Sequence, residues 1–300
     1  MTGTSEATFT ANRPRLVGVA YRMLGSVGDA EDVVQEAWLR WARVDPSTVD
    51  DPTAFLVRTV SRLALDRMRR VAARRETYVG PWLPEPVLTA RTDAGVEDPA
   101  AEAERAASLS MAMLVVLETL SPLERTVFVL HEAFAYPYTE IADILDRSPA
   151  AVRQLAHRAR EHVAARRPRF APDPGLRRDA TERFLRASVQ GDLAALLELL
   201  APDAVLWADG GGKVRAPRRP IQGADKIARF FVGIGDDAVP SGSTVEIVEV
   251  NGGPAAVLMG PSGAEAVLQL DLDDDGRVTD IRMVGNPDKL AGLATLAPDR

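Results

Sequence analysis

The spacing of apolar residues changes once along this chain of 300 residues, and that change limits the folds it can adopt. Up to about residue 200 apolar residues recur every three or four positions, which is typical of amphipathic helices. Beyond about residue 243 they alternate with polar residues, and Gly-containing turns separate the alternating runs, as in an antiparallel meander. Because one hydrophobic core rarely grows to this length, the sequence predicts helical domains followed by a separate α+β domain.

The first helical stretch covers residues 9–75 and predicts three helices, with Asp29 as the expected N-cap of the second. The second stretch covers residues 109–167. Within it Ser121 is followed by Pro122 and then by Glu124, which predicts a helix start with a capping box. Between the two stretches, YVGPWLPEPV contains three prolines and is expected to be extended, and a polar linker, RTDAGVEDPAAEAE, follows it.

The segment YTEIADILDRSPAAVRQLAHRAREHV predicts a helix from about Thr139 to Asp146, a break, and a second helix from about Pro149. This spacing is typical of a helix-turn-helix, whose second helix enters the major groove of DNA; an ordinary helical pair is the alternative. With Val152, Leu155 and Ala159 facing inward, the second helix would present these candidate base-reading residues: Ala150, Ala151, Arg153, Gln154, His157 and Arg158.

The net charge of −7 argues against a nucleic-acid partner only when it is taken over the whole chain. Residues 58–75 contain seven arginines and one acidic residue, Asp66, and a second basic cluster extends from Arg153 to Arg169. Local basic stripes of this kind are typical of phosphate binding, although solvated helix faces would look the same.

In the C-terminal part, one or two helices are expected over residues 176–200, followed by strands joined by turns. The segment DLDDDG resembles the start of a calcium loop, but Arg282 stands where a bidentate Glu is required, so a hairpin turn is predicted. Trp38, Trp41 and Trp207 are expected in hydrophobic cores, whereas Trp82, in the proline-rich segment, is expected to dock on a neighbour.

A catalytic or metal site is not expected in the C-terminal domain. The chain has no cysteine, and its histidines, His131, His157 and His162, all precede that domain, so the usual acid–base and thiolate groups are missing there. Neither a catalytic residue nor a metal ligand nor a cofactor is therefore assigned. The absence of a signal peptide and of a long apolar run leads us to expect a soluble cytoplasmic protein without a membrane partner.

The segments DAEDVVQEAWLRWAR, AFLVRTVSRLALDRMRR and SPLERTVFVLHEAFAYPYTEIADILDRSPAAVRQLAHRARE together resemble the extracytoplasmic-function sigma factors of bacterial RNA polymerase. The resemblance covers about residues 9–75 and 109–167, in the order of the two sigma regions. YVGPWLPEP, DGGGK (Asp209–Lys213) and NPDKL (Asn286–Leu290) resemble signatures of a subgroup that carries a fused SnoaL-like domain, an α+β cone-shaped barrel.

This resemblance implies a multidomain fold with two all-α sigma domains, the second containing the helix-turn-helix, and a C-terminal α+β SnoaL-like barrel. The implied boundaries are sigma region 2 at 1–75, a Pro-rich linker at 76–108, sigma region 4 at 109–170 and the SnoaL-like domain at 176–292. The implied partners are core RNA polymerase and the −10 and −35 elements of promoter DNA. A small-molecule signal in the C-terminal domain is an open alternative.

The resemblance also implies roles for particular residues. The helix Asp29–Arg43 would dock on the polymerase clamp helices through Asp32, Gln35 and Glu36. The loop Asp45–Thr53 and the helix that follows would open and read the −10 element, with these candidate residues: Arg58, Ser61, Arg62, Arg69 and Arg70. Many relatives have Asn at the middle of this helix, where this chain has Ser61-Arg62.

The triple glycine of DGGGK does not fit a P-loop, because its glycines are adjacent and Val214 follows the lysine. A hairpin needs only one or two glycines, so we expect a neighbour to pack closely on this loop. Our hypothesis is that the loop and NPDKL dock on the sigma domains or the linker and set their spacing; a purely structural loop is the alternative. The residues assigned to this contact are Trp82, Asp209, Gly210, Gly211, Gly212, Lys213, Asn286, Pro287, Asp288, Lys289 and Leu290.

The predicted function is that of a sigma factor, a DNA-binding transcription initiation factor regulated in cis by its C-terminal domain. One alternative is a SnoaL-type enzyme tethered to DNA by the helix-turn-helix. Another is a ligand-sensing regulator with the same DNA-binding motif, which would leave the helices between Asp29 and Arg75 without a role.

Overall fold

The computed structural model describes residues 2–75, 77–89, 110–166, 174–234 and 242–296. The chain forms two compact units. One, the helical unit, comprises Met1–Glu76 and Met113–Arg167, and the other, the C-terminal unit, comprises Thr77–Ala112 and Pro168–Arg300. The described part of the predicted linker, residues 77–89, therefore belongs to the C-terminal unit, and we call it the linker arm. The polar segment RTDAGVEDPAAEAE and the basic residues Arg167 and Arg169 lie outside the described residues.

The first half of the helical unit contains α1 (Thr2–Leu24), α2 (Val27–Trp41), the short 3-10 helix η1 (Pro46–Thr48) and α3 (Pro52–Arg75). Trp41 is fully buried among these helices, and its indole nitrogen donates to the carbonyl of Ser5 at 2.9 Å. The prediction of Asp29 as N-cap was wrong: Ser26 caps α2 by accepting from the Asp29 amide at 3.2 Å. The Asp29 carboxylate instead pairs with Arg67 of α3, a long-range partner that local spacing could not reveal.

The second half contains α5 (Met111–Glu118), α6 (Pro122–Phe128), the π-helical segment η2 (Val129–Ala133), α7 (Tyr138–Leu145) and α8 (Pro149–Arg166). The capping box at Ser121 and Glu124 is confirmed, with both reciprocal hydrogen bonds present. Asp146 adopts a left-handed conformation (φ +53°) immediately after α7, and this residue ends the helix. The break and restart predicted for the helix-turn-helix segment are thereby confirmed.

Buried arginines join the two halves of the helical unit. Arg125 of α6 donates through Nε to the carbonyl of Arg22 in α1 at 3.0 Å and pairs with Glu118. Burial lowers the pKa of Arg125 to about 9 and that of Arg22 to about 10. Arg22 also lies 5.0 Å above the ring of Phe134. The helices expected as two separate sigma domains thus form one unit, because polar contacts that are far apart in the sequence link them.

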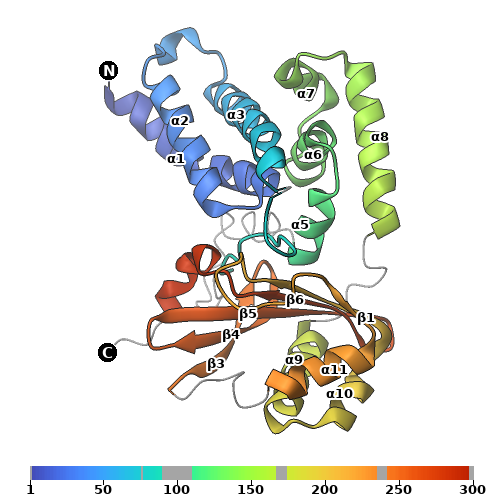
Figure 1. Cartoon of the computed structure of the whole chain (residues 1–300). Coiled ribbons are helices and arrows are strands. Elements are labelled where there is room, and N and C mark those ends of the chain that lie inside the picture. Colours follow the sequence, from blue (N-terminus) through green and yellow to red (C-terminus); the bar gives the residue numbers. More distant parts are fainter. Residues whose placement is uncertain (1, 76, 90–109, 167–173, 235–241, 297–300) are drawn as a thin grey trace. The chain divides into compact units, whose positions relative to one another are not determined.

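The C-terminal unit is a six-stranded sheet with three helices on one face (Figure 1). The helices are α9 (Pro174–Gln190), α10 (Leu193–Leu199) and α11 (Ala224–Ile234). The strand order is β2-β1-β6-β5-β4-β3, comprising β1 (Leu200–Asp209), β2 (Ile221–Gln222), β3 (Thr244–Val250), β4 (Gly253–Gly260), β5 (Gly263–Leu272) and β6 (Val278–Val284). Phe184 and Phe231 meet edge to face at 4.9 Å within the core between the helices and the sheet.

The predicted meander, β3 to β6, is confirmed by its antiparallel ladders, and DLDDDG is the turn between β5 and β6, where Asp273 accepts from the amides of Asp275 and Arg277. The sequence pattern did not give the bounds of β1, which pairs parallel to β6 in the middle of the sheet. β1 ends at Asp209, the first residue of DGGGK. Of the three tryptophans expected in cores, only Trp41 is fully buried; Trp38 and Trp207 are half-buried.

Candidate functional site

The carboxylate of Asp209 is the centre of a polar cluster within the C-terminal unit. Its side chain is fully buried. Oδ1 accepts from the hydroxyl of Tyr78 at 2.6 Å, and Oδ2 accepts from the amide of Leu83 at 2.9 Å, so one side chain from β1 holds two points of the linker arm. Lys289 donates to the same Oδ2 at 2.7 Å and compensates the buried charge.

Lys289 makes the second set of contacts with the linker arm. Its ammonium group donates to the carbonyl of Leu83 and lies 4.0 Å from the ring centroid of Trp82 and 5.2 Å from that of Tyr78. Asn286 donates to the Tyr78 hydroxyl at 2.8 Å. Burial, followed by the hydrogen bond to Asp209, raises the pKa of Tyr78 above its usual value, so this phenol remains a neutral donor.

Each glycine of the DGGGK loop has a neighbour at the place where a Cβ atom would stand. A Cβ on Gly211 would lie 2.3 Å from Asn286 Nδ2, one on Gly212 would lie 3.1 Å from Val79 of the linker arm, and one on Gly210 would lie 2.8 Å from Val214 O. Gly211 and Gly212 also have positive φ, +60° and +71°. The loop therefore needs three glycines because three different groups approach its backbone.

A second attachment holds the end of the linker arm on the turn between β3 and β4. Val87 and Asn251 exchange two hydrogen bonds, from Val87 N to Asn251 Oδ1 at 3.1 Å and from Asn251 N to Val87 O at 2.8 Å. Thr89 N donates to Glu249 O at 2.9 Å, and Leu88 bridges Val250 in antiparallel fashion. The arm is thus fixed at both ends of its described length.

The remaining residues assigned to this contact have more peripheral positions. Lys213 is exposed and pairs with Asp288 at 2.6 Å, which links the DGGGK loop to NPDKL. Pro287 is the first residue of the short helix η4 (Pro287–Lys289), which Asn286 caps, and Leu290 is buried.

On α8 the candidate −35 residues share the outward face. Arg153, Gln154, His157, Arg158 and Ala150 are exposed and Ala151 is half-buried, whereas Val152, Leu155 and Ala159 are buried as predicted. Arg158 is also tied to Glu124 of α6 at 3.0 Å. Arg153 and Gln154 have no ion pair or side-chain hydrogen bond within the described part of the chain. Neither side chain is therefore held by another residue within the described part of the chain.

The candidate −10 residues on α3 do not share one surface. Arg58, Arg69 and Arg70 are exposed, but Ser61 is fully buried, so its side chain is not on a surface that DNA could contact in this structure. Arg62 donates to two carbonyls of α7, Ile144 O at 2.7 Å and Asp143 O at 3.1 Å. These carbonyls belong to the last turn of α7, where backbone acceptors lack helical partners.

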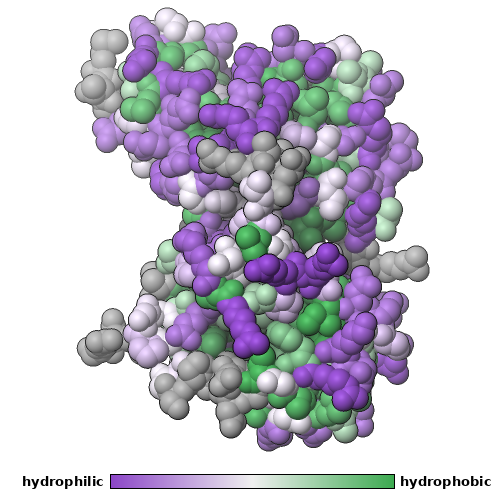
Figure 2. All heavy atoms as spheres, viewed as in Figure 1, coloured by the Kyte–Doolittle hydropathy of each residue, from purple (hydrophilic) through white to green (hydrophobic). Residues whose placement is uncertain are grey.

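The predicted polymerase-binding residues lie on the exposed face of α2. Asp32, Gln35 and Glu36 are exposed, and the opposite face of the helix is buried. Asp32 lies 3.2 Å from Arg67, and Glu36 pairs with Arg40 at 2.7 Å. Hydrophilic side chains likewise cover much of both units on the face that Figure 2 shows, with smaller hydrophobic areas between them.

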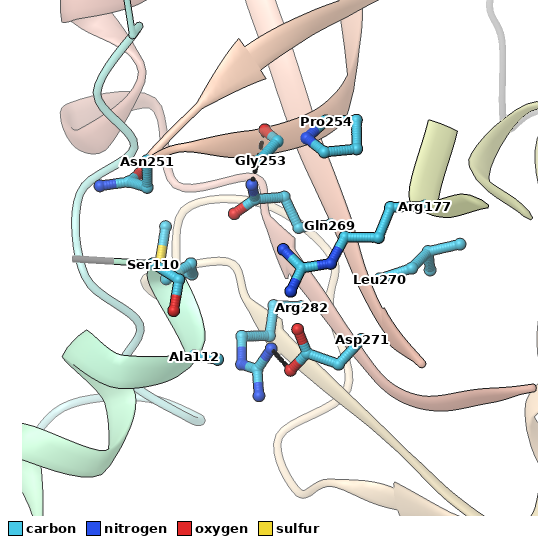
Figure 3. A pocket seen from close by; sticks show the side chains of 11 residues that line it. Ser110, Ala112, Arg177, Asn251, Gly253, Pro254, Gln269, Leu270, Asp271 and Arg282 are labelled. Carbon is cyan, nitrogen blue, oxygen red and sulfur yellow. Dashed lines mark hydrogen bonds and ion pairs between the residues drawn. The ribbon is translucent and has the colours of Figure 1, made fainter. Parts of the chain in front are cut away.

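A polar cavity lies at the junction of α9 with β4, β5 and β6 (Figure 3). Arg282 pairs there with Asp271, and three buried atoms lack a hydrogen-bond partner: Arg177 Nε, Gln269 Oε1 and Arg282 Nε. The cavity volume is about 10 Å³, which suits one water molecule. A water could accept from the two arginines and donate to Gln269, so the cavity gives no support to the small-molecule signal that the sequence left open.

Neither a metal cluster nor a membrane helix is found in the described part of the chain. No group of three or more His, Cys, Asp or Glu side chains there could hold a metal ion. No described helix is long and apolar enough to cross a membrane.

The sequence did not reveal Tyr78 and Leu83 as parts of the Asp209 cluster, nor Asn251 as part of the second attachment. Leu83 acts through its backbone, which no side-chain pattern reveals. A signal did exist for Asn251, because it lies in the turn NGGP and adopts the left-handed conformation (φ +49°) that Asn tolerates better than most residues.

Comparison with protein families matches three parts of the chain. A Sigma-70 region 2 model matches residues 8–75, a Sigma-70 region 4 model matches residues 110–163, and a SnoaL-like domain model matches residues 181–285.

Two relatives and one solved structure cover nearly the whole chain. The chain is 41% identical over 293 residues to the ECF RNA polymerase sigma factor SigJ of Mycobacterium tuberculosis, covering 95% of this chain and 92% of the relative. It is 34% identical to the probable ECF RNA polymerase sigma factor SigI of the same species, and the match covers 96% of this chain and 95% of SigI. The crystal structure of M. tuberculosis SigJ matches with a TM-score of 0.74 at 37% identity, over 95% of this chain and 98% of that one.

Proposed function

Since this chain belongs to the extracytoplasmic-function RNA polymerase sigma factors, we propose that its C-terminal unit regulates promoter use in cis by holding the linker arm. As a sigma factor, the protein binds core RNA polymerase and directs promoter-specific transcription initiation. The proposal concerns how the SnoaL-like part acts on that activity.

The observation that carries the proposal is the buried carboxylate of Asp209, which accepts from the hydroxyl of Tyr78 and the amide of Leu83 in the arm. In the sequence the arm joins the segment matched by sigma region 2 to the segment matched by region 4. A connector held at several points has fewer conformations than a free one, and its effective length sets how two binding modules can engage one DNA molecule. The arm would therefore restrict the distance between the −10 and −35 elements that the protein accepts.

Within this proposal we assign −10 contacts to Arg58, Arg69 and Arg70, −35 contacts to Arg153 and Gln154, and polymerase contacts to Asp32, Gln35 and Glu36. The support is their exposure on α3, α8 and α2 and the family resemblance. We propose a regulatory and not a catalytic role for the C-terminal unit, because it contains no histidine or cysteine and its polar cavity suits one water molecule.

Transcription from promoters of graded spacer length tests the proposal. Lys289→Met removes the ammonium group that contacts Asp209, Leu83 and Trp82, and we expect it to broaden the range of spacer lengths that support initiation by the reconstituted holoenzyme. Lys226→Met, an exposed position on α11, is the matched control. An unchanged spacer-length profile, together with faster amide exchange over residues 77–89 in the Lys289 variant, would contradict the proposal. The arm would then be released from Asp209 and Lys289 without any change in the promoter spacing that the protein accepts.

A further inference from the structure

A basic groove lies beside the DGGGK loop. Its volume is about 280 Å³. Two residues of the linker arm, Val79 and Gly80, form one part of its wall. The rest comes from the end of β1 and the loop that follows: Ala208, Gly210, Gly212, Val214, Arg215, Ala216, Pro217 and Arg218.

The charge of this groove is entirely positive. Arg215 and Arg218 are the charged residues among those that line it, and Arg219 is their exposed neighbour in the sequence. Within the described residues, none of these three arginines has an ion pair or a side-chain hydrogen bond. Among the other exposed cations of this unit, Lys213 pairs with Asp288 and Arg229 with Asp225, whereas Lys226 has no ion pair within the described residues. Three unpaired guanidinium groups within five residues therefore form a surface that fits an anion.

The shape and composition of the groove favour a sugar–phosphate backbone. Val79 and Val214 are 46% and 43% exposed, so apolar wall lies next to the arginines, as a deoxyribose next to a phosphate would require. Its lining contains no aromatic side chain on which an unpaired base could stack, which argues for a duplex over a single strand. Pro217 and Pro220 restrict the backbone of the loop that carries the arginines.

We propose that this groove binds phosphates of duplex promoter DNA and gives the sigma factor a third, sequence-independent DNA contact. Val79 follows Arg75, the last residue of α3, by only four residues, so the groove stays on a short tether to the helix assigned to the −10 element. Arginine contacts to phosphates position a protein on DNA without reading the sequence. The proposal uses the established DNA binding of a sigma factor and does not depend on how the linker arm regulates it.

The salt dependence of promoter binding tests the proposal. Holoenzyme containing the Arg215→Gln/Arg218→Gln double variant is titrated with a fluorescent promoter duplex at several salt concentrations. Each lost phosphate contact lowers the slope of log K against log salt by about 1, so the expected decrease is about 2. Two promoters of unrelated sequence should lose affinity by the same factor, because phosphates are common to both.

The matched control is Arg178→Gln/Arg229→Gln, which removes two exposed arginines of α9 and α11 from the same unit. It should leave the slope unchanged. The proposal is wrong if the groove variant keeps the wild-type salt slope. It is also wrong if the slope of the control variant decreases by as much as that of the groove variant. Binding of labelled single-stranded RNA and of inorganic phosphate is measured in parallel. A loss of affinity confined to one of these two ligands would also overturn the assignment to duplex DNA. The spacer-length profile of the groove variant stays that of the wild type, which separates this result from the test of the linker arm.

Discussion

Asp209 and Lys289, which are 80 positions apart in the sequence, form a buried ion pair with 2.7 Å between Oδ2 and Nζ. The Asp209 side chain is 0% exposed and that of Lys289 is 9% exposed. Removal of one partner from such a pair leaves an uncompensated charge in a low-dielectric site, which is more costly than the loss of both.

We therefore expect Lys289→Met and Asp209→Asn each to lower the free energy of unfolding by about 3–5 kcal/mol. The double variant should lower the free energy of unfolding by clearly less than the sum of the two single variants, because neither charge is then left without its partner. Urea denaturation of the full chain measures this. Additive effects would mean that the two groups do not act as a pair.

The close approach of Asn286 to Gly211 predicts a sharp difference between two glycines of the same backbone conformation. Gly211→Ala would place a methyl group 2.3 Å from Asn286 Nδ2, whereas Gly191, with φ +65°, has nothing within 4 Å of that position. Both substitutions carry the strain of positive φ, so their difference reports the clash alone. We expect Gly211→Ala, and not Gly191→Ala, to speed amide exchange across residues 77–89; equal effects would assign the loss to backbone strain.

The hydrogen bonds from Arg62 to the end of α7 predict a role in fixing that helix. Arg62→Ala leaves the carbonyls of Asp143 and Ile144 without these donors, so amide exchange at the end of α7 should rise. Discrimination of the −10 sequence should change less than in Arg58→Ala, because both arginines are exposed but only Arg62 is hydrogen-bonded to α7. A larger loss of −10 discrimination for Arg62→Ala than for Arg58→Ala would mean that Arg62 contacts the −10 element.

On α8 the exposed Arg153 and Gln154 should read bases. Alanine at either position should reduce the binding free energy by about 1–3 kcal/mol for promoters with particular −35 base pairs. Arg166→Ala, at the end of the same helix, should weaken all sequences alike and lower the salt slope by about 1. Binding to a set of −35 variants distinguishes the two effects, and an unchanged base preference for Arg153→Ala would reduce that residue to a phosphate contact.

The exposed face of α2 predicts a polymerase contact that can be lost without unfolding. Asp32→Lys/Glu36→Lys should reduce the recovery of core polymerase in a pull-down, while circular dichroism remains that of the wild type. Glu31→Lys on the same helix, where Glu31 pairs with Arg13, is the control for charge alone. Normal recovery by a folded double variant would refute the assignment.

The start of α6, the restart at α8 and the hairpin turns were predictable because their causes are local. The capping box joins Ser121 to a residue three positions away, and the restart at Pro149 follows a single left-handed residue, Asp146. The alternating pattern likewise predicted the strands from β3 to β6, since each pairs with its neighbour in the chain through a short turn.

Contacts between distant residues were decided only by the tertiary structure. The sequence left both the sigma domains and the linker open as the neighbour of the DGGGK loop and did not reveal Tyr78, which meets Asp209 and Asn286 across 131 and 208 positions of the chain. Ser61 and Arg62 are adjacent on one helix, yet packing buries the first and directs the second to α7. Periodicity can assign a residue to a face of its own helix, but the chemistry at that face depends on which other element covers it.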